Sequence, residues 1–227
     1  MQSKVQLSII LAVYNKQHSL KPVLNTLTHT IEQSLKITDY EIIIIDDAST
    51  DNTRALLKEL EPNPRLHILY NADNAGQLKA LETGLKAATG KYTVLSSCDL
   101  QNPLEKLPLL YNALENGYDC AIAYRVLRNE RGINNYLAKF FWLIISFVFP
   151  KIPKGGFDFA AISSDVKSNL LKKDFSEIFL QIEMIQLSPK VFYLPVERKE
   201  DLLDNSTWSF QKRAIYAAKV IKYLYKR

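Results

Sequence analysis

Three polar clusters in the sequence each follow an apolar run of strand length. They are Tyr14 with Asn15, Asp46 with Asp47, and Ser97 with Asp99. A carboxylate at the end of a buried strand can accept hydrogen bonds from a nucleobase imide and from a ribose hydroxyl. Helix capping by Ser49 or Asp51 is the structural alternative, but capping needs one such residue and does not explain two adjacent acids. The pair Asp46 and Asp47 therefore predicts a ligand site.

The elements that must position these clusters alternate between strand and helix. The pattern predicts strands at residues 7–13, 41–46, 66–70, 92–96 and 119–124, and helices at residues 19–35, 52–60, 77–88 and 104–116. Strand–helix–strand repeats with short connections favour right-handed crossovers and a mostly parallel, doubly wound sheet. Because ligands of such sheets bind at the carboxyl ends of the strands, we expect the three clusters to lie side by side on one rim.

The second half of the sequence is less regular. It predicts a strongly apolar helix at 134–149, strands at 157–162 and 191–196, helices at 166–171 and 177–187, and a basic final helix at 209–225. No linker composition interrupts the chain, so we treat residues 1–227 as a single α/β domain with a C-terminal helical elaboration.

Composition narrows the possible partners. The chain has 227 residues and a formal charge of +5, which suits nucleic acid, anionic lipid or a phosphorylated substrate. Two cysteines, Cys98 and Cys120, provide neither a disulfide framework nor a four-ligand zinc site, and both are expected to be buried thiols.

No segment has the order of a signal peptide, so a cytoplasmic location is expected. The longest apolar run, residues 140–149, is shorter than the roughly 20 residues that span a bilayer.

Five segments together resemble a known family. They are SIILAVYNK, EIIIIDDASTDNT, NADNAGQLKALETGLKAATGKYTVLSSCDLQNP, GGFDFAAIS and STWSFQKR, in that order. They are similar to motifs of the family 2 glycosyltransferases, in the branch that resembles dolichol-phosphate mannosyltransferase and loads sugars onto polyprenyl phosphates. The resemblance covers about residues 6 to 220.

The resemblance implies a Rossmann-like GT-A fold and an inverting hexosyltransferase that uses a nucleoside diphosphate sugar, with a UDP-sugar favoured. It implies nucleotide contacts at Val13, Tyr14, Asp46 and Asp47, a Mg²⁺ or Mn²⁺ ion and the diphosphate at Asp99, and sugar or acceptor contacts at Gln101, Arg125, Asp158 and Arg198. Asp99, Gln101 and Asp158 are the expected catalytic residues. If Asp47 is a ligand contact, its replacement by alanine is expected to weaken UDP binding with little effect on thermal stability.

The expected acceptor explains the arginines. A polyprenyl phosphate is already an anionic nucleophile, so it needs a cationic cradle more than a general base, and Arg125, Arg128, Arg131 and Arg198 are candidates. Two alternatives stay open. One is transfer to a saccharide acceptor, with Asp158 as the base. The other is a non-catalytic subunit that binds a nucleotide sugar or partners a membrane protein. No nucleic-acid partner is expected, and self-association is left open.

Several positions depart from the family pattern. Ser97 stands where the acidic metal motif usually has its first aspartate, and Cys98 stands in the middle place. Lys16, Lys91 and Thr207 replace a glutamate, an aspartate and a lysine, respectively. These changes remove negative charge beside the expected metal and one positive charge near the expected phosphate.

The apolar helix at 134–149 carries a high density of aromatic residues between basic ones. Phe140, Phe141, Trp142, Phe147 and Phe149 lie in it, with Lys139, Lys151 and Lys154 nearby. Packing in the core is the common fate of such a helix, but this composition also suits an interfacial helix. We expect the protein to lie peripherally at the inner face of the cytoplasmic membrane, with residues 1–125 as the nucleotide-sugar-binding half and residues 126–227 as the acceptor-facing and membrane-facing half.

Overall fold

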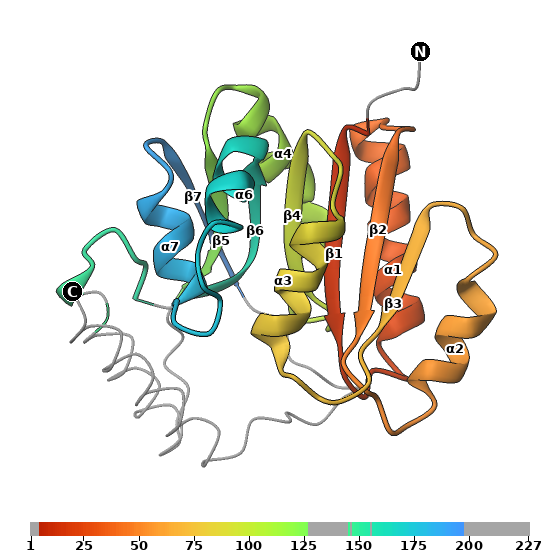
Figure 1. Cartoon of the computed structure of the whole chain (residues 1–227). Helices are drawn as coiled ribbons and strands as arrows, with labels where there is room; N and C mark the ends of the chain where they lie inside the picture. The colour runs from red at the N-terminus through yellow and green to blue at the C-terminus, as the bar shows by residue number, and fades with distance from the viewer. Residues whose placement is uncertain (1–4, 127–144, 146, 155, 198–227) are drawn as a thin grey trace.

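A computed structural model describes residues 5–126, 145, 147–154 and 156–197. One seven-stranded sheet forms its centre, in the order β3-β2-β1-β4-β6-β5-β7 (Figure 1). The strands are β1 (Leu7–Val13), β2 (Tyr40–Asp46), β3 (Leu66–Tyr70), β4 (Tyr92–Ser97), β5 (Cys120–Arg125), β6 (Phe157–Ser163) and β7 (Val191–Val196). Strand β6 runs antiparallel to both of its neighbours, and the other neighbouring pairs are parallel. The expectation of a mostly parallel α/β sheet is therefore confirmed.

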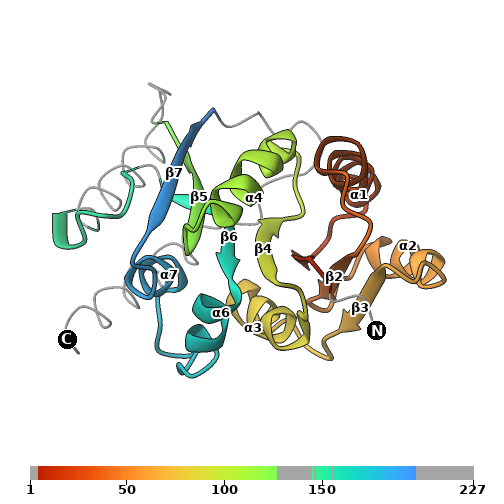
Figure 2. The same cartoon turned by 90° about the horizontal axis from the view of Figure 1, so that it is seen from above.

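Helices cover both faces of this sheet (Figure 2). They are α1 (Leu20–His29), α2 (Thr53–Leu60), α3 (Gln77–Ala87), α4 (Leu107–Glu115), α6 (Ser164–Leu170) and α7 (Leu180–Gln186). A π-helical turn, Thr30–Leu35, continues α1, and a 3-10 turn, Leu104–Lys106, precedes α4. Helices α1, α2 and α4 contribute to one hydrophobic core, and α3, α6 and α7 contribute to the other.

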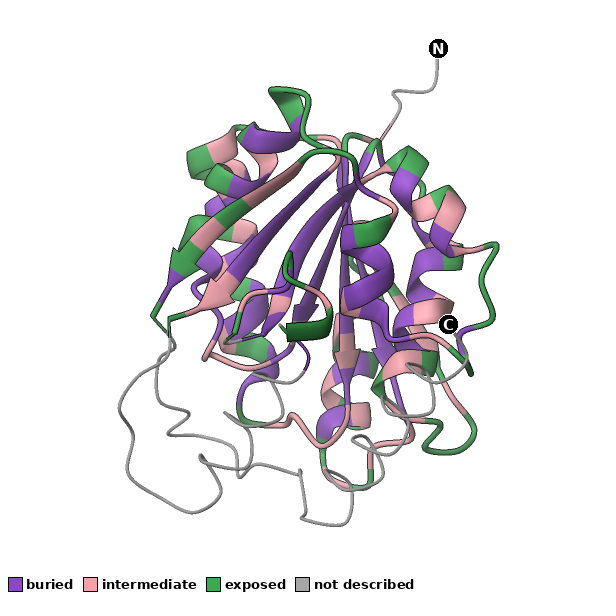
Figure 3. Cartoon of the chain, turned by 90° about the vertical axis from the view of Figure 1, so that its left-hand side faces the viewer, coloured by how far each residue is buried: buried purple, intermediate pink, exposed green. Residues whose placement is uncertain are grey.

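The central strands explain why both faces need covering. All seven residues of β2 are buried, and its isoleucines alternate between the two cores. Ile42 and Ile44 belong to the core beneath α1, whereas Ile43 and Ile45 belong to the core beneath α3. Since successive side chains of a strand point to opposite faces, a continuous apolar run specifies a strand buried on both sides. Figure 3 shows this burial along the central strands.

The predicted elements agree closely with those of the structure. Strands β1, β3 and β7 have the predicted bounds, and most other ends differ by one or two residues. The long first helix is divided, because α1 ends at His29 and the π-helical turn closes at Lys36, whose φ is 57°. The predicted helix at 209–225 and most of the one at 134–149 lie outside the described residues.

Both cysteines are buried free thiols, as expected. Burial raises the pKa of Cys120 to about 12, so this thiol stays protonated. Within the described part of the chain, no helix is both long and apolar enough to cross a membrane.

Candidate functional site at the carboxyl rim of the sheet

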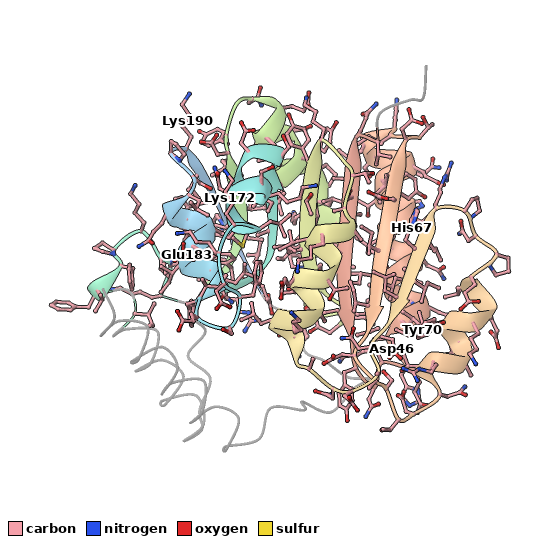
Figure 4. The ribbon with its side chains drawn as sticks, viewed as in Figure 1. Asp46, His67, Tyr70, Lys172, Glu183 and Lys190 are labelled. Atoms are coloured by element: carbon pink, nitrogen blue, oxygen red, sulfur yellow. The ribbon has the colours of Figure 1, made fainter. Side chains whose placement is uncertain are left out.

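The three polar clusters lie side by side at one rim of the sheet. Val13 of β1 pairs with Asp46 of β2, and Ala12 pairs with Ser97 of β4. Asp46 in turn pairs with Tyr70 at the end of β3. Figure 4 shows Asp46 and Tyr70 close together at this end of the sheet. The parallel register therefore confirms the expected proximity of the clusters.

The turns after β1 and β2 are joined by hydrogen bonds around Asn15. Its backbone N–H donates to Ser49 Oγ at 3.0 Å, and its Oδ1 accepts from the backbone N–H groups of Thr50 at 2.8 Å and Asp51 at 3.3 Å. Asn15 also has a φ of 53°, a left-handed conformation that asparagine tolerates better than most residues. The turn that follows Tyr14 is thus fixed to the turn that follows Asp47. The sequence placed Asn15 in a cluster but gave it no role, because its partners lie more than 30 residues away.

Asp46 is fully buried and ion-paired. Its Oδ1 accepts from Ser49 N at 3.1 Å, and its Oδ2 accepts from Arg54 Nε at 2.8 Å. The Arg54 guanidinium lies 5.3 Å from the centre of the Tyr70 ring and donates to the Asn71 carbonyl at 3.2 Å. Arg54 therefore covers Asp46 on the side of β3. No signal in the sequence pointed to this arginine, because its partner Asp46 lies on another element.

Tyr70 stays neutral at this rim. Burial, a hydrogen bond to Glu61 and the negative charges of Glu61 and Asp46 raise its pKa to about 12. Its hydroxyl donates to Glu61 Oε1 at 2.8 Å, so its ring is held beside the Arg54 guanidinium.

Asp47 holds the loop that leads into α3. It is 4% exposed; its Oδ1 accepts from Asn71 Nδ2 at 2.8 Å and Ala75 N at 3.0 Å, and its Oδ2 accepts from Gly76 N at 2.8 Å. Gly76 has a φ of 87°, which suits glycine. The sequence predicted a ligand contact at Asp47, and the structure adds that its carboxylate already accepts three hydrogen bonds from within the protein. In this structure it fixes the start of α3 at the rim.

The end of β4 carries the altered acidic motif. The Ser97 hydroxyl oxygen accepts from Asn102 Nδ2 at 2.7 Å, and Asp99 Oδ1 accepts from Gln101 N at 3.1 Å. The buried Ser19 hydroxyl donates to the Cys98 carbonyl at 2.8 Å, which anchors the middle of the motif to the start of α1. Asp99 and Gln101 are therefore placed at the same rim as Asp46 and Asp47.

Arg125 and Asp158 form an ion pair at the same rim. Arg125 ends β5 and Asp158 is the second residue of β6, so the antiparallel pairing of these strands brings them together. The two side chains are 30% and 24% exposed, and Arg125 Nε is buried without a hydrogen-bond partner among the described residues. The other three candidate arginines, Arg128, Arg131 and Arg198, lie outside the described residues.

The described residues of the rim could hold a metal ion only together with a bound substrate. In the described part of the chain, no group of three or more His, Cys, Asp or Glu side chains is placed to hold an ion. Mg²⁺ commonly binds through one or two carboxylates together with substrate phosphates. Asp99 fits that mode, in which phosphate oxygens of a bound diphosphate would supply further ligands.

Relatives of known type match a large part of the chain. The undecaprenyl-phosphate 4-deoxy-4-formamido-L-arabinose transferases of Yersinia pestis (strain Pestoides F) and Yersinia enterocolitica are 36% and 38% identical to it over 128 residues. Each match covers 55% of this chain and 38% of the relative, so the chain corresponds to well under half of these proteins.

Solved structures match over a larger share of the chain at lower identity. A mannosyltransferase from Pyrobaculum calidifontis, solved with GDP-Man and Mn²⁺, superposes with a TM-score of 0.65 at 18% identity, over 97% of this chain and 63% of that one. Glucosyl-3-phosphoglycerate synthase from Mycobacterium tuberculosis gives a TM-score of 0.65 at 16% identity, over 96% and 78%. These similarities show the GT-A fold.

The family model described as glycosyl transferase family 2 matches residues 8–168. This range includes strands β2 to β4 and all of β1 except Leu7, together with the three polar clusters and the Arg125–Asp158 pair. The chain therefore belongs to glycosyl transferase family 2.

Proposed function

We propose that this protein transfers a sugar from a nucleoside diphosphate sugar to a polyprenyl phosphate. The observation that carries the proposal is the meeting of Tyr14, Asp46 with Asp47, and Ser97 with Asp99 at one rim of a GT-A sheet. A donor needs contacts for a base, a ribose and a diphosphate, and these clusters supply acceptors and donors for all three on adjacent strands.

The donor side of the proposal draws on the structural neighbours. The Pyrobaculum enzyme was solved with GDP-Man, the mycobacterial synthase with UDP-glucose, and the Staphylococcus aureus protein TarS with UDP-GlcNAc. We assign the nucleotide contacts to Val13, Tyr14, Asp46 and Asp47, and we favour a UDP-sugar. Because Asp46 is covered by Arg54, the base would meet this pair rather than an unpaired carboxylate.

A divalent cation is part of the proposal. Two of the neighbouring structures contain Mn²⁺. We assign the binding of such an ion, whether Mg²⁺ or Mn²⁺, to Asp99, which lies in the turn after β4 at the rim. When bound, the ion neutralises charge on the leaving diphosphate. Gln101 follows Asp99 in the same turn, where we expect it to contact the sugar.

The acceptor side draws on the relatives and on Arg125. The curated relatives are named for undecaprenyl phosphate, whose phosphate oxygen is already negatively charged. That oxygen attacks the anomeric carbon as the bond to the diphosphate breaks, so a single displacement inverts the configuration. Arg125, held by Asp158, is suited to bind the incoming phosphate, and Arg198 and its neighbours would complete the cradle.

The acceptor would be reached at a membrane surface. Phe147 is 87% exposed and Val148 is 47% exposed, and the exposed Lys151 and Lys154 follow them. Ile145 points into the core instead, so this short helical segment has one buried and one exposed side. We propose peripheral contact with the inner face of the cytoplasmic membrane, residues 1–125 binding the donor and residues 126–227 facing the acceptor and the lipid.

The direct test is a transfer assay with a panel of nucleotide sugars, with and without added polyprenyl phosphate. The proposal expects release of nucleoside diphosphate that depends on the lipid phosphate, together with a glycosylated lipid product. Turnover with a saccharide and none with the lipid would favour the saccharide alternative. Donor binding with no turnover on any acceptor would favour the non-catalytic alternative.

A metal titration tests the same site independently of turnover. UDP-sugar and Mn²⁺ should strengthen each other's binding, because each supplies ligands or charge that the other needs, and Asp99→Asn should abolish this coupling. Equal Mn²⁺ affinity with and without the nucleotide sugar would remove Asp99 from the metal site.

A further inference from the structure

Asn102 binds the residue that replaces the first acid of the metal motif. It lies in the turn after β4, is 6% exposed, and its Nδ2 lies 2.7 Å from Ser97 Oγ and 3.3 Å from Ser96 Oγ. An amide nitrogen donates and does not accept, so the Ser97 oxygen is the acceptor in this bond. A hydroxyl that accepts still carries its own hydrogen. Asn102 therefore leaves the Ser97 hydrogen available for another partner.

The position of Ser97 indicates which part of the rim that hydrogen can reach. Ser97 is half-buried at the carboxyl end of β4, two residues before Asp99. No hydrogen bond among the described residues uses the Ser97 hydroxyl as a donor. Leu95 of β4 pairs with Ala160 of β6, and both strands continue two residues toward the rim, to Ser97 and Asp158. The Ser97 hydroxyl is thus a donor at the same level of the sheet as the Arg125–Asp158 pair.

A hydroxyl at position 97 favours a different ligand from the one that a carboxylate there would favour. A carboxylate only accepts when ionised, so it approaches a diphosphate through a cation. A hydroxyl can donate directly to a phosphate oxygen, and such charge-assisted hydrogen bonds are the stronger ones. The neutral serine also avoids charge repulsion between the protein and the diphosphate.

We propose that Ser97 binds a phosphate oxygen of the nucleoside diphosphate directly, and that Asn102 is the positioning residue that makes Ser97 a donor. This inference rests on the proposed function, since it names a contact to the donor substrate. It assigns Asn102 a role in binding the nucleoside diphosphate sugar. It also gives Ser97 a binding role of its own beside Asp99.

The test uses calorimetry on the full chain. Wild type is titrated with UDP, GDP and ADP, and the tightest of these is compared with its parent nucleoside, in EDTA and in Mn²⁺. Ser97→Ala should weaken the diphosphate about tenfold in both buffers and leave the nucleoside unchanged, whereas Ser97→Thr should keep the wild-type affinity. Asn102→Asp has nearly the same shape but accepts the Ser97 hydrogen, so it should reproduce the loss caused by Ser97→Ala. Adding Ser97→Ala to Asn102→Asp should then cost nothing more.

Each other outcome overturns the inference. Unchanged diphosphate affinity in Ser97→Ala removes the contact, and an equal loss for the nucleoside would indicate a structural effect. A loss seen only with Mn²⁺ would mean that Ser97 acts through the ion. Additive losses in the double variant would mean that Asn102→Asp acts by charge repulsion. If Asn102→Asp does not fold, Ser97→Ala against Ser97→Thr still decides the contact. Wild-type protein that binds none of the three diphosphates would overturn the proposed function together with this inference, whereas binding without a Ser97 effect overturns the inference alone.

Discussion

At the scale of single residues, Asp46 and Asp47 are adjacent acids with different tasks. Their side chains leave β2 on opposite faces of the sheet. Asp46 faces α2 and is paired with Arg54, whereas Asp47 faces α3 and holds the loop at Ala75 and Gly76. The sequence predicted a ligand site here, because helix capping does not account for two adjacent acids. It could not show that both would be bonded inside the protein, because their partners come from other turns.

Asp47→Ala should therefore destabilise the fold as well as weaken the binding of the nucleotide. Asp47 accepts three hydrogen bonds at 2.8–3.0 Å while 4% exposed, so the substitution should cost about 2 kcal/mol of unfolding free energy. Urea denaturation measures this loss. Asp73→Ala is the matched control, since Asp73 is exposed on the same loop. Equal stability of Asp47→Ala and wild type would restore the interpretation of Asp47 as a pure ligand contact.

Asp158 separates two acceptor chemistries at the residue scale. General-base catalysis typically contributes about 10²–10⁴-fold to rate, whereas an anionic phosphate needs no base. Because Asp158 is ion-paired with Arg125, we expect it to position the arginine, and Asp158→Asn should lower kcat by less than about tenfold. Arg125→Gln should mainly raise KM for polyprenyl phosphate.

Steady-state kinetics with varied lipid acceptor measures both effects. Lys190, an exposed residue that precedes β7, offers a charge-removal control in Lys190→Gln. A fall of kcat by more than about 10²-fold in Asp158→Asn, with KM unchanged, would show that Asp158 is a base and that the acceptor is a hydroxyl.

At the scale of elements, helix α3 packs unusually close to the sheet at Gly84. A Cβ added to Gly84 would overlap Ile10 Cγ2 and lie 2.8 Å from Ile45 Cδ1. Both isoleucines belong to the central strands, where they are buried among other side chains and cannot move freely. The glycine therefore sets the distance between α3 and strands β1 and β2, which end at the rim.

Gly84→Ala should destabilise the protein despite the higher helix propensity of alanine. Overpacking of this kind costs about 1–3 kcal/mol, and the propensity gain offsets about 1 kcal/mol at most. We expect a net loss of unfolding free energy and weaker UDP binding, since α3 begins at the loop that Asp47 holds. Thr83→Ala is the control, because it gains helix propensity at the neighbouring position without entering the core. A Gly84→Ala variant as stable as wild type would show that the strands can move to accept the methyl group.

The elements were predictable from the sequence to the extent that their signals are local. The β-branched runs of β1 and β2 and the helical period of α1 each show within a dozen residues. The antiparallel direction of β6 depends on its neighbours β4 and β5, so no local pattern reveals it. For the same reason the site could be predicted as strand ends at one rim, whereas Arg54 and Asn102 were missed. Their importance comes from contacts to Asp46 and Ser97 across turns.

At the scale of the whole molecule, exposed apolar and basic side chains lie together in the segment before β6. Phe147 and Val148 are exposed, and the exposed Lys151 and Lys154 follow them. Tyr193 of β7, itself 36% exposed, donates to the Lys151 carbonyl at 2.8 Å. This hydrogen bond ties the segment to the edge strand of the sheet. Apolar side chains beside basic ones are typical of surfaces that lie in the headgroup region of a membrane.

The protein should therefore bind anionic vesicles in a way that salt weakens. Each basic residue near anionic lipid contributes about 1 kcal/mol, and burial of a phenylalanine side chain contributes about 1.5–3 kcal/mol. Phe147→Ser should lower the partition coefficient by about tenfold or more, and Lys151→Glu combined with Lys154→Glu should remove most of the salt dependence. Flotation with vesicles of phosphatidylglycerol and phosphatidylcholine, at low and high salt, measures both.

Leu109→Ser provides the matched control for this experiment. Leu109 is 45% exposed but lies on α4, so its replacement removes a similar apolar area from a different element. It should leave flotation unchanged, because a docking surface depends on where the apolar side chains lie and not on their total number. Equal losses for Phe147→Ser and Leu109→Ser would indicate non-specific adsorption. Wild-type protein that stays entirely in the vesicle-free fraction at low salt would exclude this surface as the membrane contact.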